Sequence, residues 1–368
     1  LLSICCMFIF AGCNDGDKDK VQLVGIDVKT NTLQTEYFVG DAINIQNGKI
    51  VLSYSNNNKE EQTITQEMIS DFDSSTPGER YLTITFGNQK TYFTYYVSSY
   101  TSEEYFNFES IQNKNEVKIT GLKGEYPKAI YVPKTLGGKI VTTIDTNAFK
   151  NANVDKIVMF DGITTIAPQA FANCYKVDEI VLPNSVTSIG SYAFYNCSSL
   201  ERVTLPKQID KIGEYAFYNC KTLVEIIMPE TLTELGDGVF YDCSALDEIE
   251  LPNTLTKIGI MAFAKCESLV NINLKNVETI SKWALYCCSS LKNVDISSAK
   301  VLADSCLAYT NLQNITLPEG LKTIGNEVFS DCQSLESINF PSTIESLGEK
   351  TFEDCENLKT VNFAENTT

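Results

Sequence analysis

The sequence contains no histidine, and this absence removes several kinds of chemistry at once. A Ser-His-Asp triad, a Cys-His nucleophile pair and an imidazole metal site all need a residue that the chain lacks. Basic residues are also scarce, because 29 lysines and arginines face 47 aspartates and glutamates, for a formal net charge of -18. Such a chain repels phosphate backbones and anionic lipid, so we expect neither nucleic acid nor a charged membrane surface as a partner.

Residues 1–13 (LLSICCMFIFAGC) form an apolar stretch that is too short to span a bilayer as a helix. Two small residues precede Cys13, as at the processing site of an exported protein. The letters FAGC resemble a lipobox, which implies that a lipid on Cys13 is the only anchor of an exported outer-membrane or cell-surface protein. A plain signal peptide with an incidental cysteine is the alternative. Residues 14–20 (NDGDKDK) are polar and acidic, so we expect a solvated tether.

Residues 21–98 alternate between apolar and polar side chains, with turn signals between the runs. The series Ile50, Leu52, Tyr54 follows the hairpin signal Asn47-Gly48, and several such short strands predict a β-sandwich. Further residues resemble the pattern of bacterial Ig-like domains: Tyr37, Gly40, Asp41, Phe72, Asp73, Gly78, Tyr95 and Val97. The resemblance implies a spacer domain, and no catalytic constellation is visible in it.

The chain then repeats itself with a period of 23 residues. Rows that begin at Pro183, Pro206, Pro229 and Pro252 share the pattern P-x-x-h-x-x-I-G-x-x-A-F-x-x-C-x-x-L-x-x-I-x-L, in which h is apolar. Full rows also begin at Pro318 and Pro341, whereas residues 275–296 and 297–317 form rows that are one and two residues shorter. Because each row can bury its apolar positions only against its neighbours, the pattern predicts a solenoid.

One row predicts how each coil is built. Val203 and Leu205 lie two residues apart, so they face inward from a strand while the residues between them face out. Gly213 is expected to allow a backbone turn. Ala216 and Phe217 are expected to lie in a short helical turn that fills the coil.

The cysteines recur at one position of the rows, which is occupied by Cys174, Cys197, Cys220, Cys243, Cys266, Cys288, Cys332 and Cys355. Stacking places this position on a line, so the thiols cannot converge on a metal ion, and their parallel directions oppose disulfides. We therefore predict buried free thiols and no metal site. Cys287 and Cys306 lie outside the series, and we expect them to be the more reactive thiols.

These rows resemble the BspA-like, or Treponema-type, leucine-rich repeats of bacterial surface proteins. The resemblance predicts a leucine-rich-repeat solenoid over residues 103–368, in which residues 106–124 form a hairpin that caps the first coil. The predicted fold class is mainly β with short helical turns, with the solenoid following a small Ig-like β-sandwich. No cofactor is implied.

Repeat proteins bind partners through the outward positions of their stacked strands. Two outward columns form an asparagine-rich ribbon, whose predicted ligand-binding residues are Asn271, Asn273, Asn293, Asp295, Asn314, Thr316, Asn339 and Asn362. Asparagine both donates and accepts hydrogen bonds, so the ribbon suits a polypeptide backbone or a sugar. The alternative is that asparagine only keeps an exposed strand soluble.

A column of tyrosines is the second candidate contact surface. Tyr195, Tyr218, Tyr241 and Tyr286 each follow the buried phenylalanine or leucine of their row. Aromatic rings with polar tips are common contact residues in interfaces. The alternative is that these rings pack on one another between rows.

Export signal, spacer and repeat face together predict a cell-surface anchored, non-catalytic, adhesin-like protein. Its expected partner is a host or microbial surface protein, and the family resemblance adds extracellular-matrix proteins. The alternative is a glycan-capture lipoprotein of a nutrient-uptake system. A glycosidase using Glu248 and Glu250 is a third hypothesis, but a solenoid sheet offers no water-excluding pocket, so we expect no enzymatic activity.

Overall fold

The computed structural model describes residues 21–209 and 211–364, which divide into two compact units between Tyr100 and Thr101. The expected signal segment, Cys13 and the acidic tether lie outside the described residues. The helices of the described residues are single 3-10 turns, and none has the length and apolar character of a membrane span.

The first unit is a sandwich of two β-sheets. One sheet has the order β1-β3-β4, formed by Leu23–Val28, Lys49–Tyr54 and Lys59–Thr63. The other has the order β2-β7-β6-β5, formed by Glu36–Phe38, Gln89–Ser98, Gly78–Phe86 and Ile69–Ser70, and the 3-10 turn Gln66–Met68 precedes β5. Ile50 and Leu52 of one sheet and Leu82 and Val97 of the other share one buried core. The predicted β-sandwich is therefore confirmed.

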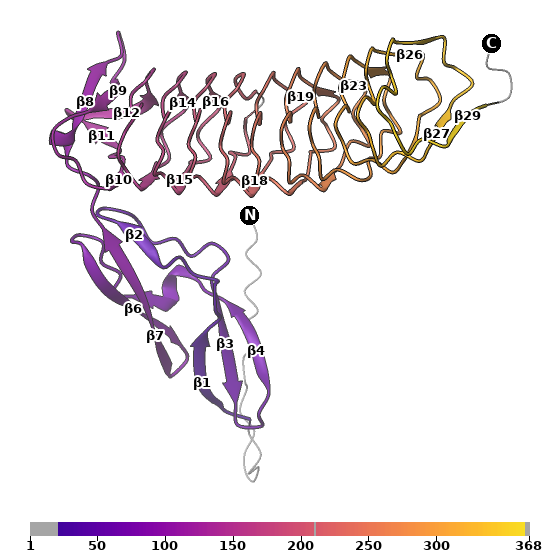
Figure 1. Ribbon diagram of the computed structural model, residues 1–368. Coiled ribbons are helices and arrows are strands. Elements are labelled where there is room, and N and C mark those ends of the chain that lie inside the picture. The colour runs from indigo at the N-terminus through magenta and orange to yellow at the C-terminus, as the bar shows by residue number, and fades with distance from the viewer. Residues whose placement is uncertain (1–20, 210, 365–368) are drawn as a thin grey trace. The chain divides into compact units, whose positions relative to one another are not determined.

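The second unit begins with a 3-10 turn, Glu103–Tyr105, and an antiparallel hairpin of β8 (Phe106–Ser110) and β9 (Glu116–Leu122). Strand β9 then pairs in parallel with β12 (Lys139–Ile144), and β11 (Thr135–Leu136) adds to β12. Figure 1 shows this hairpin at the purple end of the stacked coils.

Two ladders of short parallel strands run along the solenoid (Figure 1). The first ladder contains β10 (Ala129–Tyr131), β13 (Lys156–Val158), β15 (Glu179–Val181), β17 (Arg202–Thr204), β18 (Glu225–Ile227), β20 (Glu248–Ile249), β22 (Asn271–Ile272), β25 (Asn314–Thr316), β27 (Ser337–Phe340) and β29 (Thr360–Phe363). The second contains β12, β14 (Thr165–Ile166), β16 (Ser188–Ile189), β19 (Glu234–Leu235), β21 (Lys257–Ile258), β23 (Thr279–Ile280), β24 (Val301–Leu302), β26 (Thr323–Ile324) and β28 (Ser346–Leu347).

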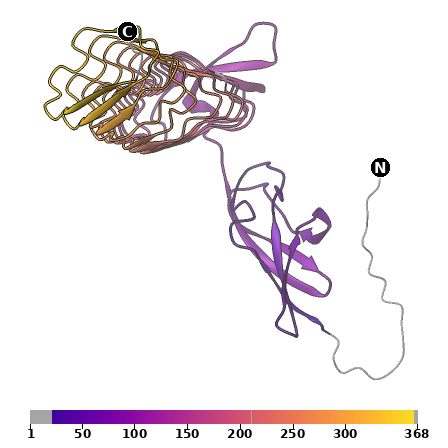
Figure 2. The same ribbon diagram turned by 90° about the vertical axis from the view of Figure 1, so that its right-hand side faces the viewer.

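Successive rows stack in register. Arg202 pairs with Glu225, 23 residues later, and Ser337 pairs with Thr360 at the same spacing. Viewed from the C-terminal side, the coils therefore lie behind one another (Figure 2). The predicted solenoid and its inward positions are confirmed, because Val203 and Leu205 are buried.

Phenylalanine forms the spine of the core. The rings of Phe149, Phe171, Phe194, Phe217, Phe240 and Phe263 stack in sequence, with neighbouring centroids 4.9 to 5.6 Å apart. All six are buried. Each ring thus packs on the equivalent ring of the rows before and after it, which is how identical rows make one continuous core.

The segment around Ala216 and Phe217 corrects one detail of the prediction, since it is a run of turns and contains no helix. Tyr215 and Asn219 take left-handed φ angles of 57° and 62°. Alternate N–H groups then point to the next coil, and that of Phe217 donates to the carbonyl of Val239 at 2.9 Å. A helix would use these N–H groups internally, so stacking favours the turns.

Gly213 is required for a different reason from the predicted turn, because its φ is not among the left-handed ones. A Cβ atom at Gly213 would lie 2.3 Å from the carbonyl carbon of Gly190 in the preceding row. The equivalent position at Gly348 would place a Cβ 2.3 Å from the backbone of Gly325. The Ile-Gly motif therefore marks a close approach of two backbones.

The cysteine series forms a hydrogen-bonded ladder. The thiol of Cys220 donates to the carbonyl oxygen of Phe194 in the preceding row at 3.2 Å, and this oxygen also accepts the N–H of Cys197. The same thiol bond recurs along the series. Burial raises the pKa of Cys220 to about 12. Cysteine here is a buried donor that satisfies a backbone carbonyl.

Of the two cysteines outside the series, only Cys287 is partly exposed. Cys306 is fully buried and burial raises its pKa, so the prediction that it is reactive is wrong. In its row, Cys306 and Leu307 occupy the two positions that alanine and phenylalanine hold in other rows. Because these two positions are buried in the core, the Cys306 thiol is buried as well.

Alkylation should separate these thiols. In the folded protein, iodoacetamide should modify Cys287 far faster than Cys220, and the rate at Cys287 should still rise above pH 9, because burial raises its pKa and only the thiolate reacts. Peptide mass spectrometry of timed samples measures both rates. Equal rates at the two sites in folded protein would contradict the buried ladder.

Candidate functional site

The asparagine-rich ribbon lies on the outward face of the first ladder. In β22, Asn271 is exposed while Ile272 is buried, and in β25 Asn314 and Thr316 are exposed on either side of buried Ile315. The alternation follows from the strand period, which turns every second side chain away from the core.

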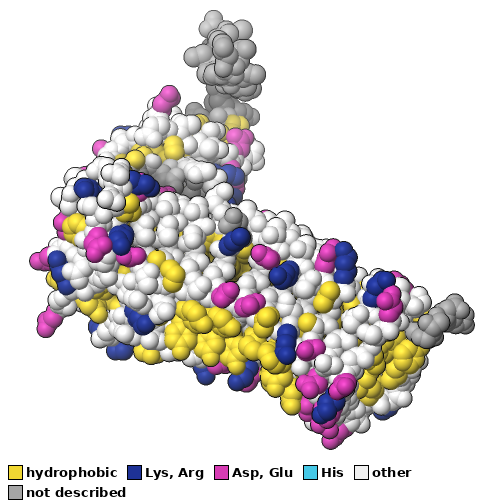
Figure 3. Space-filling view, turned by 90° about the horizontal axis from the view of Figure 1, so that it is seen from above, with side chains coloured by type: hydrophobic (Ala, Val, Ile, Leu, Met, Phe, Trp, Pro, Cys, Tyr) yellow, Lys and Arg dark blue, Asp and Glu magenta, His cyan; other side chains and the backbone are white. Residues whose placement is uncertain are grey.

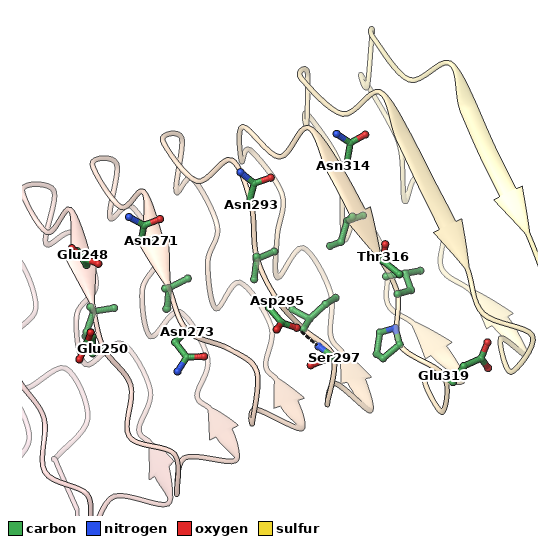
Figure 4. Close-up of a pocket in the computed structure, with 17 residues that line it drawn as sticks. Glu248, Glu250, Asn271, Asn273, Asn293, Asp295, Ser297, Asn314, Thr316 and Glu319 are labelled. Carbon is green, nitrogen blue, oxygen red and sulfur yellow. Dashed lines mark hydrogen bonds between the residues drawn. The ribbon is translucent and has the colours of Figure 1, made fainter.

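Six residues of the predicted ribbon line one groove of about 1090 Å³: Asn271, Asn273, Asn293, Asp295, Asn314 and Thr316. Figure 4 shows Asn271, Asn293 and Asn314 in one row along the groove, and Asn273, Asp295 and Thr316 in a second row. Glu248 and Glu250 lie at one end and Glu319 at the other. The two remaining ribbon residues do not line it, and Asn362 instead donates its amide to Asn339 at 2.8 Å.

The first ladder is interrupted between β18 and β20 and again between β22 and β25, and the groove lies at the second interruption. Between β22 and β25, residues 292–296 form no strand, so this row contributes to the second ladder through β23 but not to the first. In the described part of the chain, the N–H groups of Asn293, Val294 and Asp295 have no hydrogen-bond partner. The break coincides with the shortened rows 275–296 and 297–317, in which fewer residues must close the same coil.

Much of the hydrogen-bonding capacity in the groove is unused. Asp295 accepts the N–H of Ser297 at 3.0 Å, and Asn314 accepts the hydroxyl of Ser337 at 2.8 Å. Among the described residues, the side chains of Asn271 and Asn293 have no partner. Each primary amide offers two donors and one acceptor oxygen, so both are available to a ligand.

The groove is also negatively charged. One outward column of first-ladder residues leads to the groove, and its charges are paired before it reaches the groove. Lys156 pairs with Glu179 at 2.8 Å and Arg202 pairs with Glu225 at 2.6 Å. The next member of the column is Glu248, which forms no ion pair with any described residue. Asp247 and Glu250 lie beside it, also without an ion pair in that part of the chain. The groove therefore presents carboxylates that the solenoid does not neutralise.

The predicted tyrosine column is only partly continuous. Tyr195, Tyr218 and Tyr241 stack with centroids 5.3 and 4.8 Å apart, and burial raises the pKa of Tyr218. Tyr286 does not join them, because Ala264 takes the tyrosine position in the intervening row. Its ring instead contacts Tyr309 edge to face at 5.1 Å.

The tyrosines and the asparagine ribbon do not form one site. The tyrosines come from the turn segments, and none of them lines the groove. Tyr192 and Tyr215 form a second stack beside them, 5.1 Å apart. Figure 3 shows hydrophobic side chains, a class that includes tyrosine, gathered in a patch partway along the solenoid. The stacked tyrosine rings largely cover each other's faces, which agrees with the alternative interpretation that these rings pack on one another between rows.

Sequence reasoning missed a ladder of asparagine amides in the turns. Asn173 donates to Asn151 at 3.0 Å, Asn196 donates to Asn173 at 3.1 Å, and Asn219 continues the series. All four residues have left-handed φ angles, which asparagine tolerates better than most residues. The recurrent Asn-Cys pairs of the rows were the available signal.

Two family models match the chain. The BspA type leucine rich repeat region matches residues 142–269 and 233–359, and the bacterial Ig-like domain (group 3) matches residues 30–97. The chain belongs to the BspA-type leucine-rich repeat family. Neither match is to an enzyme family. No curated protein matches this BspA-type chain significantly.

One solved structure of a bacterial leucine-rich repeat protein shares the fold of this BspA-type chain, and two others are similar to parts of it. A Bacteroides ovatus protein is 24% identical over 70% of this chain and 70% of its own, with a TM-score of 0.55. A leucine rich cell surface protein of Faecalibacterium prausnitzii is 20% identical over 72% of this chain and 94% of its own, with a TM-score of 0.40. The T. pallidum leucine rich repeat protein is 22% identical over 64% and 90%, with a TM-score of 0.43.

Proposed function

We propose that this BspA-type protein is a surface-displayed, non-catalytic binding protein that holds an extended polypeptide in the groove between β20 and β25. The observation that carries the proposal is the set of groove amides without intramolecular partners, at Asn271 and Asn293. Their spacing along the stacked strands suits an extended chain, whose backbone offers donors and acceptors at regular intervals.

Charge supports a partner segment that carries lysine or arginine. Glu248 and Glu250 line one end of the groove, and neither forms an ion pair with a described residue. Complementary charges speed the encounter of two proteins and select among partners. A basic segment flanked by polar residues would satisfy both the carboxylates and the amides.

Surface display is supported by the lipobox-like sequence that ends at Cys13 and by the family. A structural neighbour is described as a cell surface protein, and this family is typical of bacterial surfaces. A lipid on Cys13, followed by the acidic tether, would hold the Ig-like domain and the solenoid outside the membrane. In this position the groove would act as an adhesin for a host or microbial protein.

Removing the two free amides tests the groove. The full chain should bind at least one of a panel of immobilised, purified proteins: fibronectin, laminin, collagen, fibrinogen and surface proteins of a second bacterium. The double variant Asn271→Ala, Asn293→Ala should weaken this binding about tenfold or more, since each lost hydrogen bond contributes about 1 kcal/mol. Biolayer interferometry measures the dissociation constants.

The matched control is Thr323→Ala, which removes an exposed polar side chain from the second ladder and should leave binding unchanged. The proposal fails if no protein of the panel binds, or if the double variant binds as tightly as the control.

A further inference from the structure

The outer face of the Ig-like domain carries three of its most exposed aromatic side chains. Tyr81 of β6 is 64% exposed, and Tyr92 and Tyr96 of β7 are 66% and 52% exposed. The strand residues next to them, such as Leu82 and Tyr95, are buried in the sandwich core. The sandwich therefore does not need the three rings for its own packing.

The pairing of β6 with β7 sets these rings on one sheet face. Tyr81 lies opposite Thr94, while Thr83 lies opposite Tyr92 and Glu79 lies opposite Tyr96. The rings of Tyr81 and Tyr92 are perpendicular, with centroids 6.2 Å apart. They do not cover each other's faces as the stacked solenoid tyrosines do. In the described residues, the hydroxyls of all three tyrosines have no hydrogen-bond partner.

The composition of this face favours a sugar over a protein. Its accessible residues on β6 and β7 are Glu79, Tyr81, Thr85, Lys90, Tyr92, Thr94, Tyr96 and Ser98, with no aliphatic side chain among them. The centres of protein interfaces are depleted in lysine and glutamate, which here stand beside the rings. A pyranose presents C–H groups to the electron-rich face of a ring, and hydroxyls to neighbouring polar groups.

The charge of this face and of the whole chain indicates which class of polysaccharide the face can bind. Carboxylates outnumber the one lysine on this face, because Glu79, Glu36 beside Tyr96 and Asp71 beside Thr83 accompany Lys90, and the whole chain carries a formal net charge of -18. An acidic polysaccharide would be repelled by the chain. We infer that Tyr81, Tyr92 and Tyr96 form a binding face for a neutral polysaccharide, independent of the groove on the solenoid.

Affinity electrophoresis of the full chain tests this inference. Native gels should contain hydroxyethyl cellulose, galactomannan or amylopectin as neutral probes, and alginate as an acidic probe. At least one neutral probe should retard the protein, and alginate should not. The variant Tyr81→Ala, Tyr92→Ala should raise the dissociation constant about tenfold or more, because it removes two ring contacts. The variant Tyr81→Phe, Tyr92→Phe keeps the rings and should stay within about threefold of the wild type.

Two controls separate this face from other effects. Tyr175→Ala removes a half-exposed solenoid tyrosine and should leave retardation unchanged. The groove variant Asn271→Ala, Asn293→Ala should also be retarded normally, even if it no longer binds protein. The inference is overturned if no neutral probe retards the chain, or if the alanine variant is retarded like the wild type. Capture of a purified protein that depends on these tyrosines, without any polysaccharide binding, would also overturn it.

Discussion

Replacing Phe217 with alanine is expected to destabilise the solenoid by about 3–5 kcal/mol. The ring is fully buried and stacks on Phe194 at 4.9 Å and on Phe240 at 5.6 Å. Its removal leaves a cavity bounded by the rings of two neighbouring rows, which cannot move together without disturbing the register of their strands. Because repeats are stabilised by their neighbours, the loss weakens two interfaces at once.

The chain offers a convenient probe for this experiment. Trp283 is the only tryptophan and lies within the solenoid, so its fluorescence during urea unfolding reports on the solenoid without a signal from the Ig-like domain. Tyr175→Ala is the matched control, since this ring is half exposed and its loss should cost little. A Phe217→Ala midpoint equal to that of the control would show that the phenylalanine spine does not hold the coils together.

Substituting Gly213 with alanine is expected to have the second largest effect on stability. The new Cβ would lie 2.3 Å from backbone atoms of the preceding row, so neighbouring coils must move apart. Forced overpacking of this kind costs about 1–3 kcal/mol, and more where backbone rather than a side chain must yield.

Gly236 provides a control in the same motif. A Cβ there would lie 3.3 Å from the nearest atom, the carbonyl oxygen of Ile212, and small shifts could relieve that contact. Gly236→Ala should therefore lower the thermal midpoint less than Gly213→Ala. If Gly213→Ala is tolerated as well as Gly236→Ala, the close approach of the two backbones does not constrain the fold.

The repeated rows made much of the solenoid predictable. Val203 and Leu205 could be assigned to the core because the same apolar positions recur in row after row. The line of buried thiols followed from the same register. The turn at Phe217 could not be predicted in this way, because its left-handed residues serve hydrogen bonds to the next coil, and a single row does not show them.

Departures from the repeat were harder to interpret than the repeat itself. The outward direction of Asn271 and Asn293 follows from the strand pattern, but the groove follows from the lost pairing at residues 292–296. The sequence shows that rows 275–296 and 297–317 are short, but it does not show which backbone hydrogen bonds between successive rows are lost. Cys306 was misjudged because its degenerate row hides the register that places it in the core. Tyr286 was grouped with Tyr241 although an alanine row separates them.

Photocrosslinking tests most directly whether the groove is the contact surface. A benzoylphenylalanine would replace Asn293 in the groove or, as the comparison, Thr323 on the second ladder of the full chain. Each protein would be irradiated with the same panel of purified matrix and bacterial surface proteins. The expected result is a crosslinked polypeptide from position 293 and none from position 323. Equal crosslinking from both positions, or crosslinking from position 323 alone, would contradict binding in the groove.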